Sequence, residues 1–291
     1  MLHTLEHVFL HALKDNLGIL PFLFVTYCIM EAMEHAMSEK TEQGVRKAGK
    51  MGPLFGGIVG LVPQCGFSAA AASFYSGGVI TLGTLLAIFL STSDEMLPIL
   101  ISETVPAVTI IKILGTKALI GVAAGFAVDF SLKRIGKGNV VKKHIHDLCE
   151  QEHCHCEEEE ASVWKSALVH TVKVFLFIFI ISILMNLVLE FGGEEALRWL
   201  ASSHSVLAAI LTGMVGLVPN CAASVIITQL YLNQFISTGA MMSGLLVSAG
   251  IGVLVLFRTN RPVRQNVKIT ALLYGIGVAS GLLIDLMGMT F

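Results

Sequence analysis

A series of long apolar stretches is the feature of this sequence that most restricts its fold. They cover residues 16–37, 53–75, 79–103 and 107–132 in the first half of the chain and 166–189, 205–232, 236–257 and 266–288 in the second. An α-helix needs about 20 apolar residues to cross a bilayer. Only 14% of the residues are charged, against roughly a quarter in a soluble domain. We therefore expect an all-α polytopic membrane protein in contact with lipid.

The chain repeats itself at an offset of 156 residues. The segment GIVGLVPQC aligns with GMVGLVPNC, with seven of nine positions identical, and GVAAG aligns with GVASG. These segments cover residues 57–65, 213–221, 121–125 and 277–281. Chance similarity between apolar helices does not keep a proline and a cysteine in the same register, so the alignment indicates two homologous halves.

Two of the four apolar stretches in each half are interrupted. The 53–75 stretch breaks at Pro63-Gln64-Cys65-Gly66, and its copy breaks at Pro219-Asn220-Cys221. The 79–103 stretch is interrupted from Ser91 to Glu95 and again at Pro98, and its copy is interrupted at Ser248-Ala249-Gly250. Proline lacks a backbone donor and clashes with the preceding turn, so we expect helices to kink or open there. Counting one broken stretch as two pieces predicts about five helical segments in each half.

The alignment divides the chain into a first transmembrane repeat, a His/Cys/Glu-rich linker and a second transmembrane repeat, at residues 1–135, 136–160 and 161–291. Cytoplasmic loops of membrane proteins are rich in Lys and Arg. Three regions, 40–50, 133–165 and 258–268, hold 14 of the 19 cations, and the corresponding loops of the other copy are poor in cations. We therefore expect inverted-topology repeats in the cell membrane, with the linker in the cytoplasm and both termini outside.

Inverted repeats with paired broken helices are typical of secondary transporters. A broken or re-entrant helix offers unpaired carbonyls, amides and helix dipoles to a cavity, where these groups can replace part of a solute's hydration shell. We expect the breaks to meet near the midplane and to form the site of an alternating-access transporter.

Asp94 and Glu95 are adjacent carboxylates inside an apolar stretch, where charge is costly unless it is paired, hydrated or bound to a cation. Their copies are Gly250 and Ile251, so the repeated scaffold does not need them. Deep in the membrane they could coordinate a hard divalent ion, exchange protons, or do both; near an interface they would simply be solvated. Neutral oxygens nearby in the two breaks belong to Ser91, Thr92, Ser93 and Ser248. For each hydroxyl the alternative is a hydrogen bond to a carbonyl one helical turn back.

Gln64 and Asn220 form one pair across the repeat, and Cys65 and Cys221 form another. Facing each other at helix breaks, they would offer amide oxygens and thiols to a transition metal or a thiophilic metalloid. The alternative for each cysteine is a small apolar residue in the core.

The linker contains the string HIHDLCEQEHCHCEEEE. Its candidate metal ligands are His153, Cys154, His155 and Cys156, an accessory set apart from the transport pathway. Short Cys/His tracts bind soft or borderline metals, although this spacing matches no closed zinc module. We expect a flexible metal collector or sensor; the alternative is a solvated charged linker.

Other polar residues in the apolar stretches have ordinary explanations. Lys112, Lys117 and Lys173 are expected to snorkel or to form ion pairs, and Asp129 and Asp285 are expected to be solvated at span ends. The glycines of GVAAG and GVASG are expected to allow close helix packing. The formal charge of −2 gives no basic patch for nucleic acid. The chain also has no HExxH pair or nucleotide loop, so we expect neither an enzyme nor a cofactor.

The paired GLVPQC and GLVPNC motifs, the STSDE break and the His/Cys/Glu linker resemble those of a family of ten-helix heavy-metal exporters. Members of this family carry names such as manganese transporter or arsenic efflux protein, and they are distantly similar to organoarsenical permeases. The resemblance covers nearly the whole chain and implies export of a metal or metalloid. Unlike the arsenical permeases, this chain has one Cys in each motif and not a closely spaced pair, which weakens a purely thiolate mechanism.

Three functional hypotheses follow from these observations. The first is a proton-coupled exporter of a divalent transition metal, with Mn²⁺ as the best candidate, Asp94 and Glu95 as charged ligands and Gln64 and Asn220 as amide ligands. The second is efflux of trivalent arsenicals through Cys65 and Cys221. The third is a membrane-bound metal sensor without flux. The partners would be the metal ion and membrane lipids, and a homodimer stays open.

Overall fold

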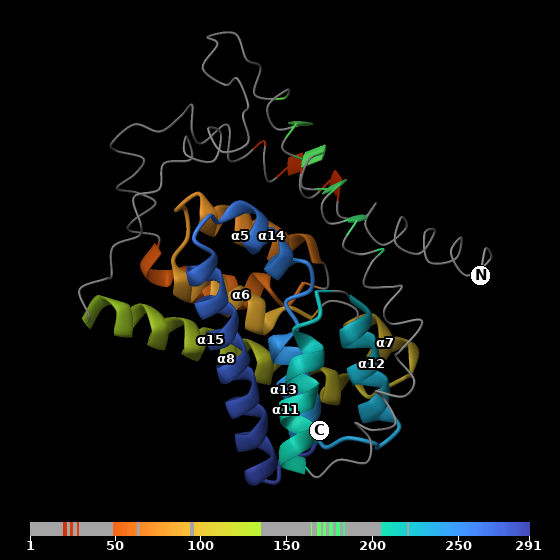
Figure 1. Ribbon diagram of the computed structural model, residues 1–291. Helices are drawn as coiled ribbons and strands as arrows, with labels where there is room; N and C mark the ends of the chain where they lie inside the picture. The colour runs from red at the N-terminus through yellow and green to blue at the C-terminus, as the bar shows by residue number, and fades with distance from the viewer. Residues whose placement is uncertain are drawn as a thin grey trace, which may run out of the picture.

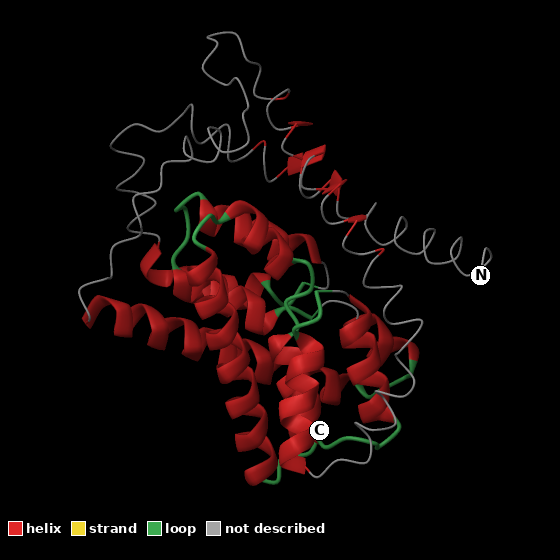
Figure 2. Ribbon diagram, in the orientation of Figure 1, coloured by secondary structure: helices red, strands yellow, loops and turns green. Residues whose placement is uncertain are grey.

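The computed structural model describes residues 49–62, 65–93, 96–134, 205–219 and 221–291, with isolated helical positions between 20 and 28 and between 164 and 183. These residues form helices joined by short loops, and no strand occurs among them (Figures 1 and 2). Most of the first apolar stretch of each half and the whole linker lie outside the described residues. The expectation of an all-α protein is confirmed for the described part of the chain.

The helices of the second half correspond to those of the first. The first half contains the short 3₁₀ helix η1 (Gly49–Met51), α4 (Gly52–Val59), α5 (Cys65–Ser76), α6 (Leu82–Ser91), α7 (Met96–Ser102) and α8 (Ala107–Arg134). The second half contains α11 (Ser205–Gly216), α12 (Cys221–Leu232), α13 (Thr238–Val247), α14 (Gly252–Thr259) and α15 (Val263–Leu286). At the offset of 156, α5 and α6 have the same bounds as α12 and α13, and α7 and α8 begin where α14 and α15 begin.

The predicted helix breaks are confirmed. One break separates α4 from α5 and another separates α6 from α7, and the second half has breaks at the corresponding positions between α11 and α12 and between α13 and α14. Their orientation across a membrane stays a prediction.

Four helical segments in the described residues are long and apolar enough to cross a membrane: Leu82–Ser102, Ala107–Arg134, Thr238–Thr259 and Val263–Leu286. In the two broken segments, 75% and 83% of the residues in the most apolar 18-residue window are buried, whereas the shares in the continuous helices α8 and α15 are 17% and 33%. The continuous helices expose large apolar side chains, such as Ile111 and Leu119 on α8. An exposed apolar surface of this kind suits lipid, so the broken spans are central and the continuous spans peripheral.

Helices pack against each other both within each half and between the two halves. Within the halves, α6 packs against α8 and α4, and α13 packs against α15 and α11 in the same way. Between the halves, α5 packs against α14 and α12 packs against α7 (Figure 1). The α5–α14 contact is close, because a Cβ atom added at Gly252 would lie 2.7 Å from Ser68 Cβ and 2.9 Å from the Phe89 ring.

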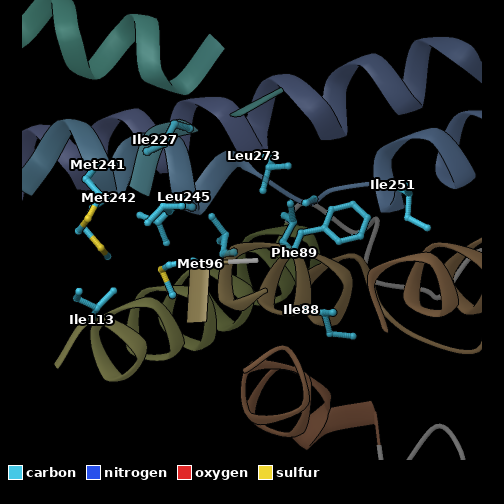
Figure 3. Close-up of a cluster of buried hydrophobic side chains, with 14 of the residues drawn as sticks. Ile88, Phe89, Met96, Ile113, Ile227, Met241, Met242, Leu245, Ile251 and Leu273 are labelled. Atoms are coloured by element: carbon cyan, nitrogen blue, oxygen red, sulfur yellow. The ribbon is translucent and has the colours of Figure 1, made fainter. Parts of the chain in front are cut away.

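One hydrophobic core joins the two halves. Figure 3 shows its side chains coming from both copies of the repeat. From the first half come Ile88, Phe89, Met96 and Ile113, and from the second half Ile227, Met241, Met242, Leu245, Ile251 and Leu273. Because the core is shared, the two halves pack directly against each other.

Glycines bring α6 onto α8 and α13 onto α15, as predicted. A Cβ atom added at Gly125 would lie 2.5 Å from the carbonyl oxygen of Gly83 and 2.9 Å from Pro53 Cβ. The copy repeats this contact, with a Cβ atom at Gly281 falling onto the carbonyl oxygen of Gly239. A side chain cannot be accommodated without moving the backbone, so close packing of these helix pairs depends on glycine.

Asp129 and Asp285 are half-exposed, and each carboxylate also caps the first turn of a neighbouring helix, a role that the sequence did not predict. Asp129 accepts a hydrogen bond from Thr81 Oγ1 at 2.7 Å and from the amide of Gly83 at 2.9 Å. Asp285 accepts from Ser237 Oγ at 2.7 Å and from the amide of Gly239 at 2.7 Å. A carboxylate at a helix N-terminus pairs with unsatisfied amides and with the positive end of the helix dipole.

Replacing Asp129 with Ala should destabilise the protein by about 2 kcal/mol, the order of magnitude for hydrogen bonds to a charged group. Asp285→Ala should have a similar effect, because the contacts are equivalent. Thermal unfolding of the purified protein in detergent measures both changes. Glu103→Ala, at an exposed position after α7, is the control and should leave the unfolding temperature unchanged. Equal stability of all three variants would contradict the capping role.

Candidate functional site

The helix breaks of each half lie next to each other. In the first half, Ser93 Oγ donates a hydrogen bond of 2.7 Å to the carbonyl oxygen of Leu61, which connects the break after α6 to the break after α4. In the second half, a Cβ atom added at Gly216, the last residue of α11, would lie 3.3 Å from the backbone nitrogen of Ser248. Figure 2 shows loop segments gathered in the middle of the helices. The protein therefore places non-helical, polar backbone in its interior.

The hydroxyls before the first break already have hydrogen-bond partners. Ser91 Oγ donates to the carbonyl of Ala87 and Thr92 Oγ1 donates to that of Ile88, each at 2.7 Å. Both are buried. The alternative that these hydroxyls bond one turn back is therefore correct. A hydroxyl that donates its proton still has lone pairs, so these oxygens can also face a cation.

Ser248 differs from the other hydroxyls. Its side chain is 2% exposed, and its Oγ has no hydrogen-bond partner within the described part of the chain. A buried polar atom without a partner costs about 1–3 kcal/mol, and such an atom in a native protein calls for an explanation such as an ion or water. Ser248 occupies the position equivalent to Thr92, directly after α13. A binding role for Ser248 stays a prediction.

Lys117, on α8, is a buried cation that the sequence reasoning did not assign to the site. Its side chain is 1% exposed. Its Nζ donates to the carbonyl oxygen of Thr92 at 2.6 Å and to that of Leu245 at 2.7 Å. Thr92 caps the C-terminus of α6, and Leu245 lies in the last turn of α13. The ammonium thus joins the C-terminal ends of α6 and α13, the first helices of the two broken spans, where helix dipoles favour positive charge.

Of the two expectations for Lys117, snorkelling is wrong, because the side chain runs inward to carbonyls of both halves; an ion pair stays a prediction. A signal for this was present in the sequence. The residue equivalent to Lys117 is Leu273, which is fully buried. The first repeat alone therefore carries both the carboxylate pair and this cation, which marks them as departures from the shared scaffold.

Several predicted site residues lie outside the described part of the chain. These are Gln64, Asp94, Glu95 and Asn220 at the breaks and His153, Cys154, His155 and Cys156 in the linker. Cys65 and Cys221 are the first residues of α5 and α12. Among the described residues, no group of three or more His, Cys, Asp or Glu side chains comes together. Metal binding by these residues stays a prediction.

The comparison with protein families assigns the chain to a class. Residues 4–196 of the 291 match the model of a family described as "Putative, 10TM heavy-metal exporter". The chain belongs to this family. The match includes the first repeat, the linker and the start of the second repeat. No curated protein and no solved structure matches the chain. The protein is therefore a multi-pass membrane protein of the heavy-metal exporter family, as its motifs suggested.

Replacing Ser248 with Ala should not destabilise the protein in the absence of metal, because no hydrogen bond from Oγ is lost. Ser243→Ala is the matched control: Ser243 is equally buried, and its Oγ donates to the carbonyl of Ala209 at 2.6 Å. The control should lose about 1 kcal/mol of unfolding free energy. Thermal unfolding in detergent distinguishes them. A larger loss for Ser248→Ala would show that this hydroxyl has a structural partner.

Proposed function

We propose that this protein is a secondary active exporter that moves a divalent transition-metal ion out of the cell in exchange for protons. Mn²⁺ is the best candidate substrate. The ion would bind where the helix breaks meet, with Asp94 and Glu95 as charged ligands and Gln64, Asn220 and hydroxyls of the breaks as neutral ligands. Family membership supports the class. The observation that carries the proposal is the burial of two broken spans in the centre of the helices.

The chemistry of the breaks favours a cation. The described part of this region offers carbonyl oxygens at the C-termini of α6 and α13 and the orphan hydroxyl of Ser248. Carbonyl, hydroxyl and carboxylate oxygens are hard ligands that suit Mn²⁺. A carboxylate pair directly after Ser93 would add the negative charge that a divalent ion needs. The same carboxylates could take up protons on the return step, which would couple the two fluxes.

The helix arrangement is compatible with alternating access. Each half contains a helix pair, α6 on α8 and α13 on α15, held together by glycines and an aspartate cap. Such pairs can move as rigid units while contacts between the halves, such as α5 with α14, rearrange. We propose that the repeats have inverted topology in the cell membrane, with the linker in the cytoplasm as an accessory metal collector and both termini outside.

Asp94→Asn should reduce Mn²⁺ uptake by everted membrane vesicles by about 10-fold or more, because a charged ligand is worth on the order of 1.5–3 kcal/mol. Uptake is measured as the initial rate with a proton gradient imposed. Glu103→Gln removes the same charge at an exposed position after α7 and should keep the wild-type rate.

Wild-type flux in Asp94→Asn would remove the carboxylate from the mechanism. Metal binding by the purified protein without flux into proteoliposomes would instead favour a membrane-bound sensor.

A second candidate, efflux of trivalent arsenicals, has one structural observation in its favour. Cys65 and Cys221 are the first residues of α5 and α12, so both follow a helix break at equivalent positions. Thiolates are the preferred ligands of soft metals and metalloids.

Cells that express a Cys65→Ser, Cys221→Ser double variant should lose arsenite resistance if the thiols carry the substrate and should keep Mn²⁺ resistance. The measurement is growth over a range of each toxicant. A matched Ser68→Ala, Ser224→Ala variant, on the same two helices, controls for damage to α5 and α12. Unchanged arsenite resistance in the cysteine variant would eliminate this candidate.

A further inference from the structure

A polar contact joins the two halves of the chain where α5 packs against α14 (Figure 1). Ser76 Oγ, at the end of α5, lies 2.7 Å from Thr259 Oγ1, at the end of α14, and both side chains are buried. Each hydroxyl also lies within hydrogen-bond distance of a carbonyl one turn back in its own helix, that of Ala72 or that of Val255. Because a hydroxyl has a single proton, one of the two donates across the interface while the other donates to its own helix.

A second hydrogen bond crosses the same interface. Gln265 Nε2, in the first turn of α15, donates to the hydroxyl oxygen of Tyr75 at 2.7 Å. The buried Asn266, next in the chain, donates to the carbonyl of Asn260 at 2.8 Å and accepts a hydrogen bond from its side chain. This pair ties the end of α14 to the start of α15, so the two contacts with α5 form one unit. We call the four residues of these contacts the α5–α14 latch: Tyr75, Ser76, Thr259 and Gln265.

The repeat contains a second copy of this interface, between α12 and α7, in which the residues of the latch are replaced. Leu232 stands at the position of Ser76, and its side chain cannot form a hydrogen bond. Glu103 stands at the position of Thr259 and is exposed, whereas Thr259 is 9% exposed. Two homologous contacts therefore differ: the end of α5 is buried against α14 through hydrogen bonds, and the corresponding ends of α12 and α7 are more exposed.

This difference has a meaning in a transporter built from inverted repeats. Alternating access closes one of two homologous ends of the pathway at a time, so a buried contact and an exposed copy of it are the expected features of one state of the cycle. The latch is adjacent in the chain to Arg258, Arg261 and Arg264, and the charge pattern predicts that this cationic region lies in the cytoplasm. The closed end is then the inner one.

We propose that the α5–α14 latch is the inner gate of the transporter, and that both of its hydrogen bonds break each time a metal ion enters from the cytoplasm. The proposal deepens the proposed export function and rests on it. Hydrogen bonds suit a gate that opens repeatedly, because water that enters the opening takes the place of each broken partner. The net cost of opening such a contact is therefore small.

The first test locks the latch with a disulfide. Because the two hydroxyl oxygens lie 2.7 Å apart and a disulfide joins two sulfurs at about 2.05 Å, a Ser76→Cys, Thr259→Cys double variant should form the bond when oxidised. The oxidised full-length protein in proteoliposomes should lose Mn²⁺ flux by about tenfold or more, because a gate that cannot open stops the cycle. Reductant should restore the flux.

Each single variant, oxidised in the same way, controls for reaction with the native cysteines and should keep its flux. Mass spectrometry verifies the cross-link. Wild-type flux through the locked protein would overturn the gate, because the contact would then be a static part of the interface. Failure of the double variant to form the disulfide would also overturn it, because the two helix ends would then not meet in the membrane.

The second test needs no flux. Ser76 is 2% exposed, so a water-soluble maleimide should reach the Ser76→Cys variant at this position only when the latch opens. Adding Gln265→Leu removes one hydrogen bond and should raise the labelling rate about fivefold, which corresponds to about 1 kcal/mol. Gln229→Leu, at an exposed position on α12, is the matched control and should leave the rate unchanged.

The two tests separate the gate from the export function. Faster labelling with Gln265→Leu in a protein whose wild type shows no Mn²⁺ flux would refute export and leave the latch as a contact that opens. Equal labelling rates with and without Gln265→Leu would refute the latch, whether or not the wild type exports the metal.

Discussion

The need to satisfy polar backbone away from water governs this structure. A helix that crosses the membrane can break only where other protein groups or a bound solute meet the freed carbonyls and amides. Here four breaks separate the described helices, and carbonyls at three of them, those of Leu61, Thr92 and Leu245, receive hydrogen bonds from Ser93 and Lys117. The continuous helices α8 and α15 screen this region from the outside. A polar interior of this kind is the physical basis for moving an ion through an apolar protein.

The repeat supplies the scaffold, and departures from the repeat supply the chemistry. Both halves keep the glycine contacts and the aspartate cap, because these features hold each helix pair together. Charge at the breaks is confined to the first half: Asp94, Glu95 and Lys117 correspond to Gly250, Ile251 and Leu273. This division explains why symmetric residues are mostly structural.

The sequence predicted the helices and their breaks well, because periodic apolar stretches and prolines act locally. It also identified the packing role of the glycines in GVAAG and GVASG. It missed the helix caps that Asp129 and Asp285 form and the inward direction of the Lys117 side chain, because charged side chains usually reach water. Their hydrogen-bond partners are 25 to 128 residues away in the chain. No local pattern shows which backbone groups a distant helix end will offer.

The amino-acid sequence by itself determined that the chain is a helical membrane protein with a duplicated scaffold, broken spans and an exporter-like set of motifs, since apolar length, proline position and internal similarity can be read residue by residue. Only the tertiary structure decided that the broken spans are central, that α5 packs against α14 and that α12 packs against α7. It also decided that one lysine joins the ends of α6 and α13 and that Ser248 Oγ has no hydrogen-bond partner among the described residues. These outcomes depend on how the two halves dock, and docking brings together atoms that the sequence keeps far apart.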